Sequence, residues 1–265
     1  MTVVAARIVI KSPREIELLR AAGQVVYRVL RELGSLVRPG IATAELDARA
    51  DELIREAGGT PLFKGVRSPQ ARLPFPAAIC ASVNEQVVHG IPSGRPLKEG
   101  DIVSIDCGVR LKGYCGDAAA TFAVGQLAPR MQQLLDVTQA ALDLAIREIG
   151  PGRRWSAIAR QMQKYVEAGG FSVVREFVGH GIGQEMHEEP KVPNYYDRSQ
   201  RQTDFELRPG MALAIEPMVT AGRPDVRLGD ATGWPVVTKD GSWAAHFEHS
   251  VAVTAQGVDV LTDGQ

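Results

Sequence analysis

An internal repeat is the feature of this chain that most constrains its fold. Three short motifs occur twice in the same order: PGIAT at 39–43 and PGRRW at 151–155, VHGIP at 88–92 and GHGIG at 179–183, EGDIVSID at 99–106 and PGMALAIE at 209–216. Any one of these matches could arise by chance, but their shared order favours a duplication. We therefore predict two similar halves that form one domain, with a functional site where they meet.

The periodicity of apolar residues predicts a helix pair followed by strands in each half. Apolar positions at helical spacing predict helices over 12–36, 43–57, 129–149 and 155–168. Short apolar runs bounded by turn residues predict strands over 77–83, 102–107, 114–124, 172–178, 211–215 and 247–254. The expected fold class is α/β (α+β), with antiparallel strands and loops over 60–76 and 221–235.

The totals indicate an ordinary globular chain. Its 265 residues, 45% of them hydrophobic, can bury a sizeable core. No linker-like segment divides it, so we expect a single domain over 1–265, with an extension at 1–11 and halves near 12–125 and 126–257.

The charge and the cysteines give the expected compartment. A net charge of -1 gives no overall attraction to nucleic acid or membrane. The N-terminus lacks an apolar signal-peptide core, and three cysteines without metal-type spacing are expected to be free thiols. We expect a cytoplasmic protein and a monomer, with no membrane and no specific nucleic-acid partner.

The repeat places acidic residues and histidines in matching positions. Asp106 matches Glu216, each at the end of an apolar strand, and Asp117 matches Glu248. Singly, each is more commonly a surface or turn carboxylate. Four carboxylates brought together would repel, and two divalent cations would remove that conflict. With His180 added, the donor set suits Mn, Fe, Co or Zn. Such a pair activates a bridging water as a hydroxide that attacks a carbonyl.

Histidines flank these acids. His180 and His187 are seven residues apart in VGHGIGQEMHEEP, and on one unbroken strand they would face opposite ways. The glycines around His180 make a bend that brings both to one cleft the better interpretation. His246 and His249 flank Glu248, and on a continuous strand both would face away from it. They are therefore left out of the predicted ligand set.

Five segments closely resemble the signature segments of type I methionine aminopeptidases. They are SVNEQVVHGIP, DIVSIDCGVRLKGYCGDAAATFAVG, VGHGIGQEMHEEP, LRPGMALAIEPM and FEHSVAVT, and the resemblance runs from about residue 12 to 254. It implies the pita-bread fold of two pseudo-symmetric halves. The implied activity is removal of the N-terminal methionine from peptides and nascent proteins, a step in protein maturation.

The resemblance also assigns roles to individual residues. The five metal ligands fall on Asp106, Asp117, His180, Glu216 and Glu248, with Asp117 and Glu248 bridging the ions. His89 matches a histidine near the substrate amine, and His187 matches one that stabilises the oxyanion. Glu216 would also carry a proton to the leaving amine. The implied methionine pocket comprises Phe75, Cys80, Met186 and Trp234, although plain core packing competes for Cys80 and Met186.

Four positions depart from the family pattern. Cys115 and Ala119 flank Asp117 where the family often has His and a hydroxyl residue, and Cys115 would share the strand face of Asp117. Arg72 stands where an aromatic residue often lines the pocket rim, and His246 replaces a common glutamine. These departures affect pocket shape, metal preference and sensitivity to oxidation, but none removes a ligand.

Two alternatives remain at this point. Xaa-Pro dipeptidases and aminopeptidases P share the ligand set and fold, but they usually read EPG and RxED at 216–218 and 247–249, where this chain has EPM and FEH. Catalytically silent pita-bread binding modules lose ligands, and here all five are present. Residues 1–40 also carry seven Lys or Arg against three acids. That excess suggests weak ribosome association, although a solvated helix face explains it as well.

Overall fold

The computed structural model describes residues 8–265, so Arg7 and most of the expected extension 1–11 lie outside it. Its helices and first strands are α1 (Pro13–Leu36), α2 (Thr43–Glu56), β1 (Thr60–Pro61), β2 (Cys80–Val83), β3 (Gln86–Val88), β4 (Ile102–Leu111), β5 (Tyr114–Ala123), α3 (Pro129–Arg147) and α4 (Trp155–Ala168). The later elements are β6 (Ser172–Val173), β7 (Gly179–Gly181), β8 (Glu188–Val192), the 3-10 helix η1 (Arg198–Gln202), β9 (Ala212–Ile215), β10 (Met218–Thr220), β11 (Val226–Leu228), β12 (Val236–Thr238), β13 (Ala244–His246), β14 (Glu248–Val253) and β15 (Val258–Val260).

The predicted helix pairs are confirmed, and the first helix shows how the sequence sets them. Ser12 and Glu15 form a capping box, in which the Glu15 carboxylate accepts the Ser12 N–H at 2.8 Å. The apolar face of α1 packs on β4 and β5. Gly116 permits this close approach, because a Cβ there would meet the Gly23 nitrogen at 2.5 Å.

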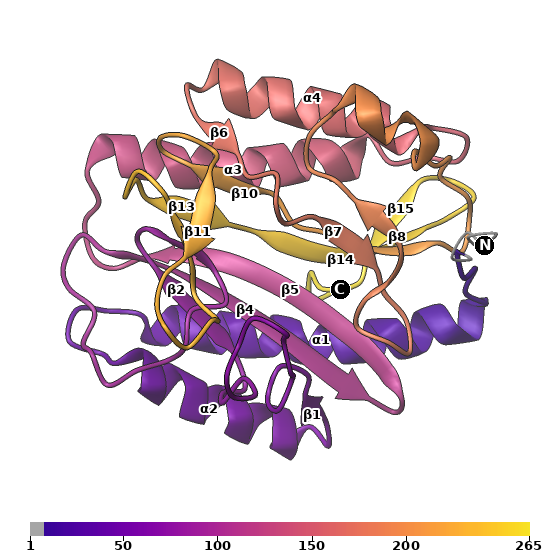
Figure 1. The fold of residues 1–265 in the computed structure, drawn as a ribbon. Coiled ribbons are helices and arrows are strands. Elements are labelled where there is room, and N and C mark those ends of the chain that lie inside the picture. The colour runs from indigo at the N-terminus through magenta and orange to yellow at the C-terminus, as the bar shows by residue number, and fades with distance from the viewer. Residues whose placement is uncertain (1–7) are drawn as a thin grey trace.

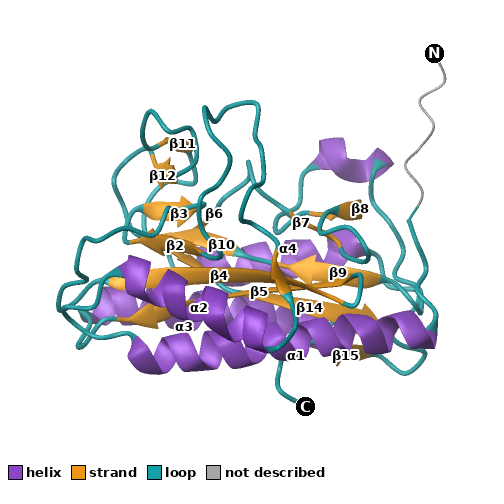
Figure 2. Cartoon of the chain, turned by 90° about the horizontal axis from the view of Figure 1, so that it is seen from below, coloured by secondary structure: helices purple, strands orange, loops and turns teal. Residues whose placement is uncertain are grey.

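A curled sheet joins the two halves of the chain. Its main path runs β1-β4-β5-β14-β9-β7-β8, and the central pair β5–β14 is antiparallel, with Glu248 opposite Ala119. The strands predicted to correspond in the repeat therefore lie on either side of one junction (Figure 1). Helices α1, α2 and α3 cover one face of the sheet, while β3, β11, β12 and long loops rise from the other (Figure 2).

Several predicted strands differ from the structure in their bounds: β2 begins only at Cys80, β4 continues to Leu111, and β11 lies within the predicted loop 221–235. Two further differences bear on the site. The strand expected at 172–178 is shortened to β6, which ends at Val173. Beyond it the chain leaves the sheet, and Phe177 and Val178 line a cavity. The strand expected from 247 begins at Glu248, because Phe247 interrupts the run between β13 and β14. Both interruptions lie beside the candidate site.

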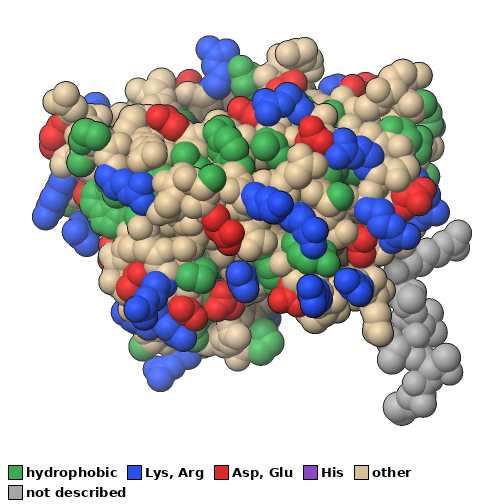
Figure 3. All heavy atoms as spheres, turned by 90° about the horizontal axis from the view of Figure 1, so that it is seen from above, with side chains coloured by type: hydrophobic (Ala, Val, Ile, Leu, Met, Phe, Trp, Pro, Cys, Tyr) green, Lys and Arg blue, Asp and Glu red, His purple; other side chains and the backbone are tan. Residues whose placement is uncertain are grey.

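The surface agrees with the balanced charge of the sequence. On the face at the top of Figure 1, side chains of Lys and Arg are interspersed with those of Asp and Glu (Figure 3). Within residues 8–265, the helices are all too short or too polar to cross a membrane. The three cysteines are free and buried.

Candidate active site

One cavity of about 330 Å³ gathers every residue that the sequence analysis assigned to the site. Its lining includes His89, His187, Asp106, Asp117, His180, Glu216, Glu248, Phe75, Cys80, Met186 and Trp234. These residues come from both halves of the chain. The expectation that they share one cleft is therefore met, while their individual roles stay predictions.

Strand register explains how the acids come together. Across the sheet, Cys80 pairs with Asp106, Asp106 with Ala119, and Ala119 with Glu248. Paired residues of neighbouring strands point to the same face, so this row places one acid, Asp106, on one side of the small Ala119 and another, Glu248, on its other side. Asp117 lies two residues before Ala119 on β5 and therefore shares that face.

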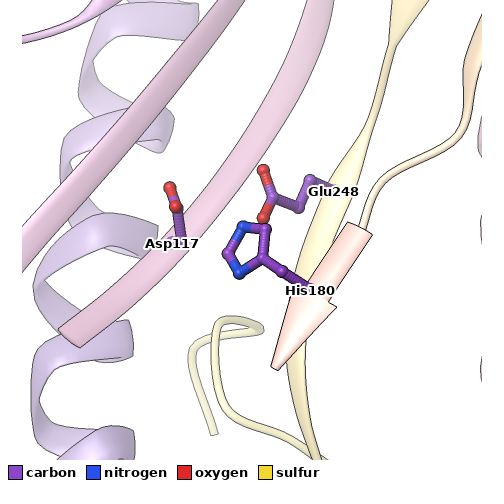
Figure 4. Close-up of side chains that lie close together, drawn as sticks. All are labelled: Asp117, His180 and Glu248. Atoms are coloured by element: carbon purple, nitrogen blue, oxygen red, sulfur yellow. The ribbon is translucent and has the colours of Figure 1, made fainter. Parts of the chain in front are cut away.

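Three donors of the cavity lining come from different strands and lie close together (Figure 4). One ligand atom each of Asp117, His180 and Glu248 lies within 4.8 Å of the others, and all three residues are buried. The Nδ1 atom of His180 contacts the Gly181 carbonyl at 2.9 Å. That contact requires the proton on Nδ1 and leaves the Nε2 lone pair free to bind a cation.

A second group of donors corrects the sequence analysis at His246. Glu216, His246 and Glu248 each offer an atom within 4.8 Å of the other two, so the prediction that His246 faces away from Glu248 is wrong. The prediction assumed one continuous strand, but the chain breaks at Phe247. His249 does face away, and its Nδ1 lies 2.8 Å from the Thr262 hydroxyl. The alternation rule alone could not have revealed His246.

Burial and mutual repulsion make the carboxyl groups basic. Burial raises the pKa of Asp106 and of Glu216 to about 7. It raises the pKa of Asp117 and of Glu248 well above their ordinary values, and neighbouring carboxylates add to the effect at both. A cluster with this electrostatic conflict is stabilised by positive charge.

Buried polar atoms without hydrogen-bond partners indicate where a positive charge would bind. Within the described residues, six buried side-chain atoms have no hydrogen-bond partner, and four belong to this cluster: Oδ1 of Asp106, Oδ1 of Asp117, Oε1 of Glu248 and Nε2 of His246. Buried polar atoms without partners are costly, and a bound metal ion would give these atoms a partner. The chemistry of the donors, carboxylate oxygens with imidazole nitrogen, fits divalent metal ions.

Two further histidines face the cluster. The ring of His187 lies 4.4 Å from that of His180, which confirms that a bend brings both to one cleft. His89 has φ of +59°, a strained conformation for a residue other than glycine, and packs edge-on against Phe177. Burial lowers the pKa of His89 to about 4, so its imidazole is neutral near pH 7.

An apolar pocket adjoins the acids. Phe75 and Trp234 pack edge to face with their ring centroids 5.1 Å apart, and Phe63, Cys80 and Met186 pack around them. The indole N–H of Trp234 donates to the Leu73 carbonyl at 2.9 Å, so its polar atom is satisfied outside the pocket. Because Cys80 pairs with Asp106, the pocket begins one strand away from the cluster.

None of the four departures is among the residues that line the cavity, and the contacts of two of them show where they lie instead. The Cys115 thiol donates to the Gln184 carbonyl at 3.4 Å and packs with Ile182 and Ala212, so it does not face the cavity. Burial raises its pKa to about 11, which disfavours the reactive thiolate. Arg72 is exposed, and its backbone N–H donates to the Thr232 carbonyl at 3.3 Å.

Comparison with known proteins gives a consistent result. Residues 17–255 match metallopeptidase family M24. Methionine aminopeptidase 1 of Bacillus subtilis (strain 168) is 47% identical over 255 residues, which cover 96% of this chain and 99% of that protein. The methionine aminopeptidase structure from Rickettsia prowazekii matches with a TM-score of 0.91 at 35% identity, and the one from Thermotoga maritima with 0.90 at 41%; each match covers 97% of this chain and 100% of the other.

Proposed function

The chain belongs to metallopeptidase family M24 and has its pita-bread fold, and we propose that it is a metal-dependent aminopeptidase that removes the N-terminal methionine from polypeptides. The observation that carries the proposal is the contact between a buried acidic cluster and a small apolar pocket. Such a site can hold a cation beside a peptide's first carbonyl while the first side chain is buried.

We assign the metal ligands to Asp106, Asp117, His180, Glu216 and Glu248. These residues supply the donors that converge on the cavity, including three of its unpaired buried atoms. When bound, divalent ions lower the pKa of a water and polarise a carbonyl, which is the chemistry that peptide hydrolysis needs. Their number, proposed as two, and their identity among Co, Mn, Fe and Zn belong to this proposal.

The remaining polar residues handle protons and developing charge. Neutral His89 can donate or accept a hydrogen bond at the substrate's amino end. His187 lies beside His180 and can donate to the carbonyl oxygen as it becomes negative. Glu216, whose pKa burial raises to about 7, can accept a proton from water and deliver it to the leaving amine.

The apolar pocket explains selection of methionine. Phe75, Cys80, Met186 and Trp234 pack as one apolar cluster, and an apolar surface of this kind disfavours polar first residues. Discrimination against a side chain that differs by one methylene is worth about 1–3 kcal/mol. The Xaa-Pro peptidase and binding-module alternatives are not favoured by the relatives of this chain.

Cytoplasmic location, a monomeric state and weak ribosome association complete the proposal. Two of the basic residues are already used within the protein and are left out of the proposed ribosome contact. Lys11 is buried in an ion pair with Glu188, and Arg20 pairs with Asp259. The arginines that stay exposed on and after α1 are Arg14, Arg28, Arg31 and Arg38. Co-sedimentation with ribosomes at low salt that disappears when these four are changed to glutamine supports docking, and no sedimentation removes it.

The assignment of roles is tested by kinetics of single variants. His187→Ala should lower kcat by about 100-fold or more while the KM changes little, since it removes a donor used in the transition state. Phe75→Ala should instead raise the KM for methionine-led peptides, because it enlarges the pocket. Equal effects of both variants on kcat and KM would contradict this division of roles.

A further inference from the structure

His246 occupies a position at the acidic cluster that no assigned role explains. Its imidazole is 2% exposed, and its Nε2 has no hydrogen-bond partner within the described residues. The same nitrogen lies 3.6 Å from Oε2 of Glu216, and a ring nitrogen of His246 lies within 4.8 Å of carboxylate oxygens of Glu216 and Glu248. A buried nitrogen aimed at a cluster of acids has two uses: to donate a hydrogen bond or to bind a cation.

The Glu216 carboxylate lies between two imidazoles in a symmetrical arrangement. Nε2 of His180 is 3.6 Å from Oε1, and Nε2 of His246 is 3.6 Å from Oε2. This separation is too long for a hydrogen bond. Two ligand atoms bound to one ion at about 2.0–2.2 Å with tetrahedral geometry lie about 3.3–3.6 Å apart. Both histidines therefore stand at the distance expected of ligands that share an ion with Glu216.

The backbone holds His246 in this place. The Thr121 hydroxyl accepts the His246 N–H at 2.9 Å and lies 2.8 Å from the His246 carbonyl, and the Ser104 hydroxyl is 2.8 Å from that of Thr121. All three residues are buried. The backbone of His246 is thus held by a satisfied network, and its Nε2 lies 3.6 Å from the Glu216 carboxylate, so the position of the residue is preorganised for a ligand.

We propose that His246 is an additional nitrogen ligand of the metal centre, on the side of Glu216 opposite His180. The inference rests on the proposed function, which supplies the metal. A second imidazole makes the donor set softer than one with a single histidine. It therefore favours Zn, Co or Fe over Mn. The departure at this position is then a change in the ligand set as well as in packing.

The test compares the wild-type protein with His246→Gln and, as a matched control, His249→Gln. Both positions flank Glu248, but His249 contacts Thr262 on the far side. Each protein is stripped of metal, titrated with Co(II), and loaded with two equivalents for X-ray absorption, which counts imidazole ligands. We expect His246→Gln to lose half of the imidazole signal and to weaken the binding of one ion by about 100-fold or more, a larger loss than residues that only contact the ligands produce. His249→Gln should match the wild type.

Two results would overturn the inference. One is an unchanged imidazole count in His246→Gln, whatever its affinity, because His246 would then act only around the ligands. The other is a wild-type signal of one imidazole for the two ions. Either leaves the proposed function standing if the wild type binds cobalt and releases methionine. If the wild type does neither, the proposed function itself fails.

Discussion

The ion pair between Lys11 and Glu188 should be the most consequential contact outside the cavity. Lys11 Nζ lies 2.6 Å from Glu188 Oε2, and the two side chains are 3% and 14% exposed. At that distance an effective dielectric constant of about 20 gives an attraction of about 6 kcal/mol, much of which desolvation offsets. Glu188 follows His187 directly, so the pair also anchors the turn that carries this histidine.

We predict that Lys11→Met lowers the free energy of unfolding by about 3–5 kcal/mol, because it leaves the largely buried carboxylate of Glu188 without its charged partner. For a chain of this size the melting temperature should fall by about 6–20 °C. The double variant Lys11→Met/Glu188→Leu should recover most of the loss. In the folded protein Lys11→Met should also lower kcat by about 10–100-fold, since small displacements of a catalytic group have effects of this order.

Denaturant unfolding of metal-stripped protein measures the stability, with Lys64→Met as the control. Lys64 and Asp51 are 3.7 Å apart with side chains 46% and 24% exposed, so breaking that pair should cost no more than about 1 kcal/mol. Equal losses for Lys11→Met and Lys64→Met would refute the reasoning. So would a double variant as unstable as the single one.

Three further perturbations follow from the same contacts. Gly116→Ala should destabilise the fold by about 1–3 kcal/mol in denaturant unfolding, because its Cβ would meet the backbone of α1. Gly150→Ala, with open space around it, is the control and should change stability by less than about 0.5 kcal/mol. Similar losses for both variants would contradict the packing argument. Chelation should lower the melting temperature measured by calorimetry, since metal at 100 times its Kd adds about 2.7 kcal/mol to the free energy of unfolding. A melting temperature that stays the same with chelator and with added metal would contradict metal binding. Asp117→Asn should reduce peptide cleavage by about 100-fold or more. It should also raise the melting temperature of the chelated protein, because it removes one of the crowded carboxylates. A lower melting temperature would show that repulsion is not what destabilises the stripped site.

Much of the fold was predictable because local signals agreed with tertiary structure. The Ser12 capping box and the apolar periodicity behind it predicted α1, and the repeat predicted two similar halves that meet at a site. In the structure the halves are joined by the pairing of β5 with β14. The acids could be found because each ends or follows an apolar strand in a repeated motif. Their convergence depends on register, which the repeat implied but could not measure.

The errors arose where the chain breaks a regular period. His246 was assigned to the wrong face because the alternation rule assumes a continuous strand, and Phe247 interrupts it. Cys115 lies two residues before Asp117 and so is on the strand face that looks toward the cavity. The turn at 182–187 lies over it, and its thiol donates a hydrogen bond to the Gln184 carbonyl. Tertiary contacts of this kind leave no periodic signal in the sequence.

The central claim is tested most directly by adding Mn, Co, Fe or Zn back to metal-stripped protein. One substrate is a peptide that begins Met-Gly, and the other begins with Xaa-Pro. The account predicts metal-dependent release of methionine from the first and no cleavage of the second. Cleavage of the Xaa-Pro peptide, or no cleavage with any metal by a protein that binds metal, would contradict it.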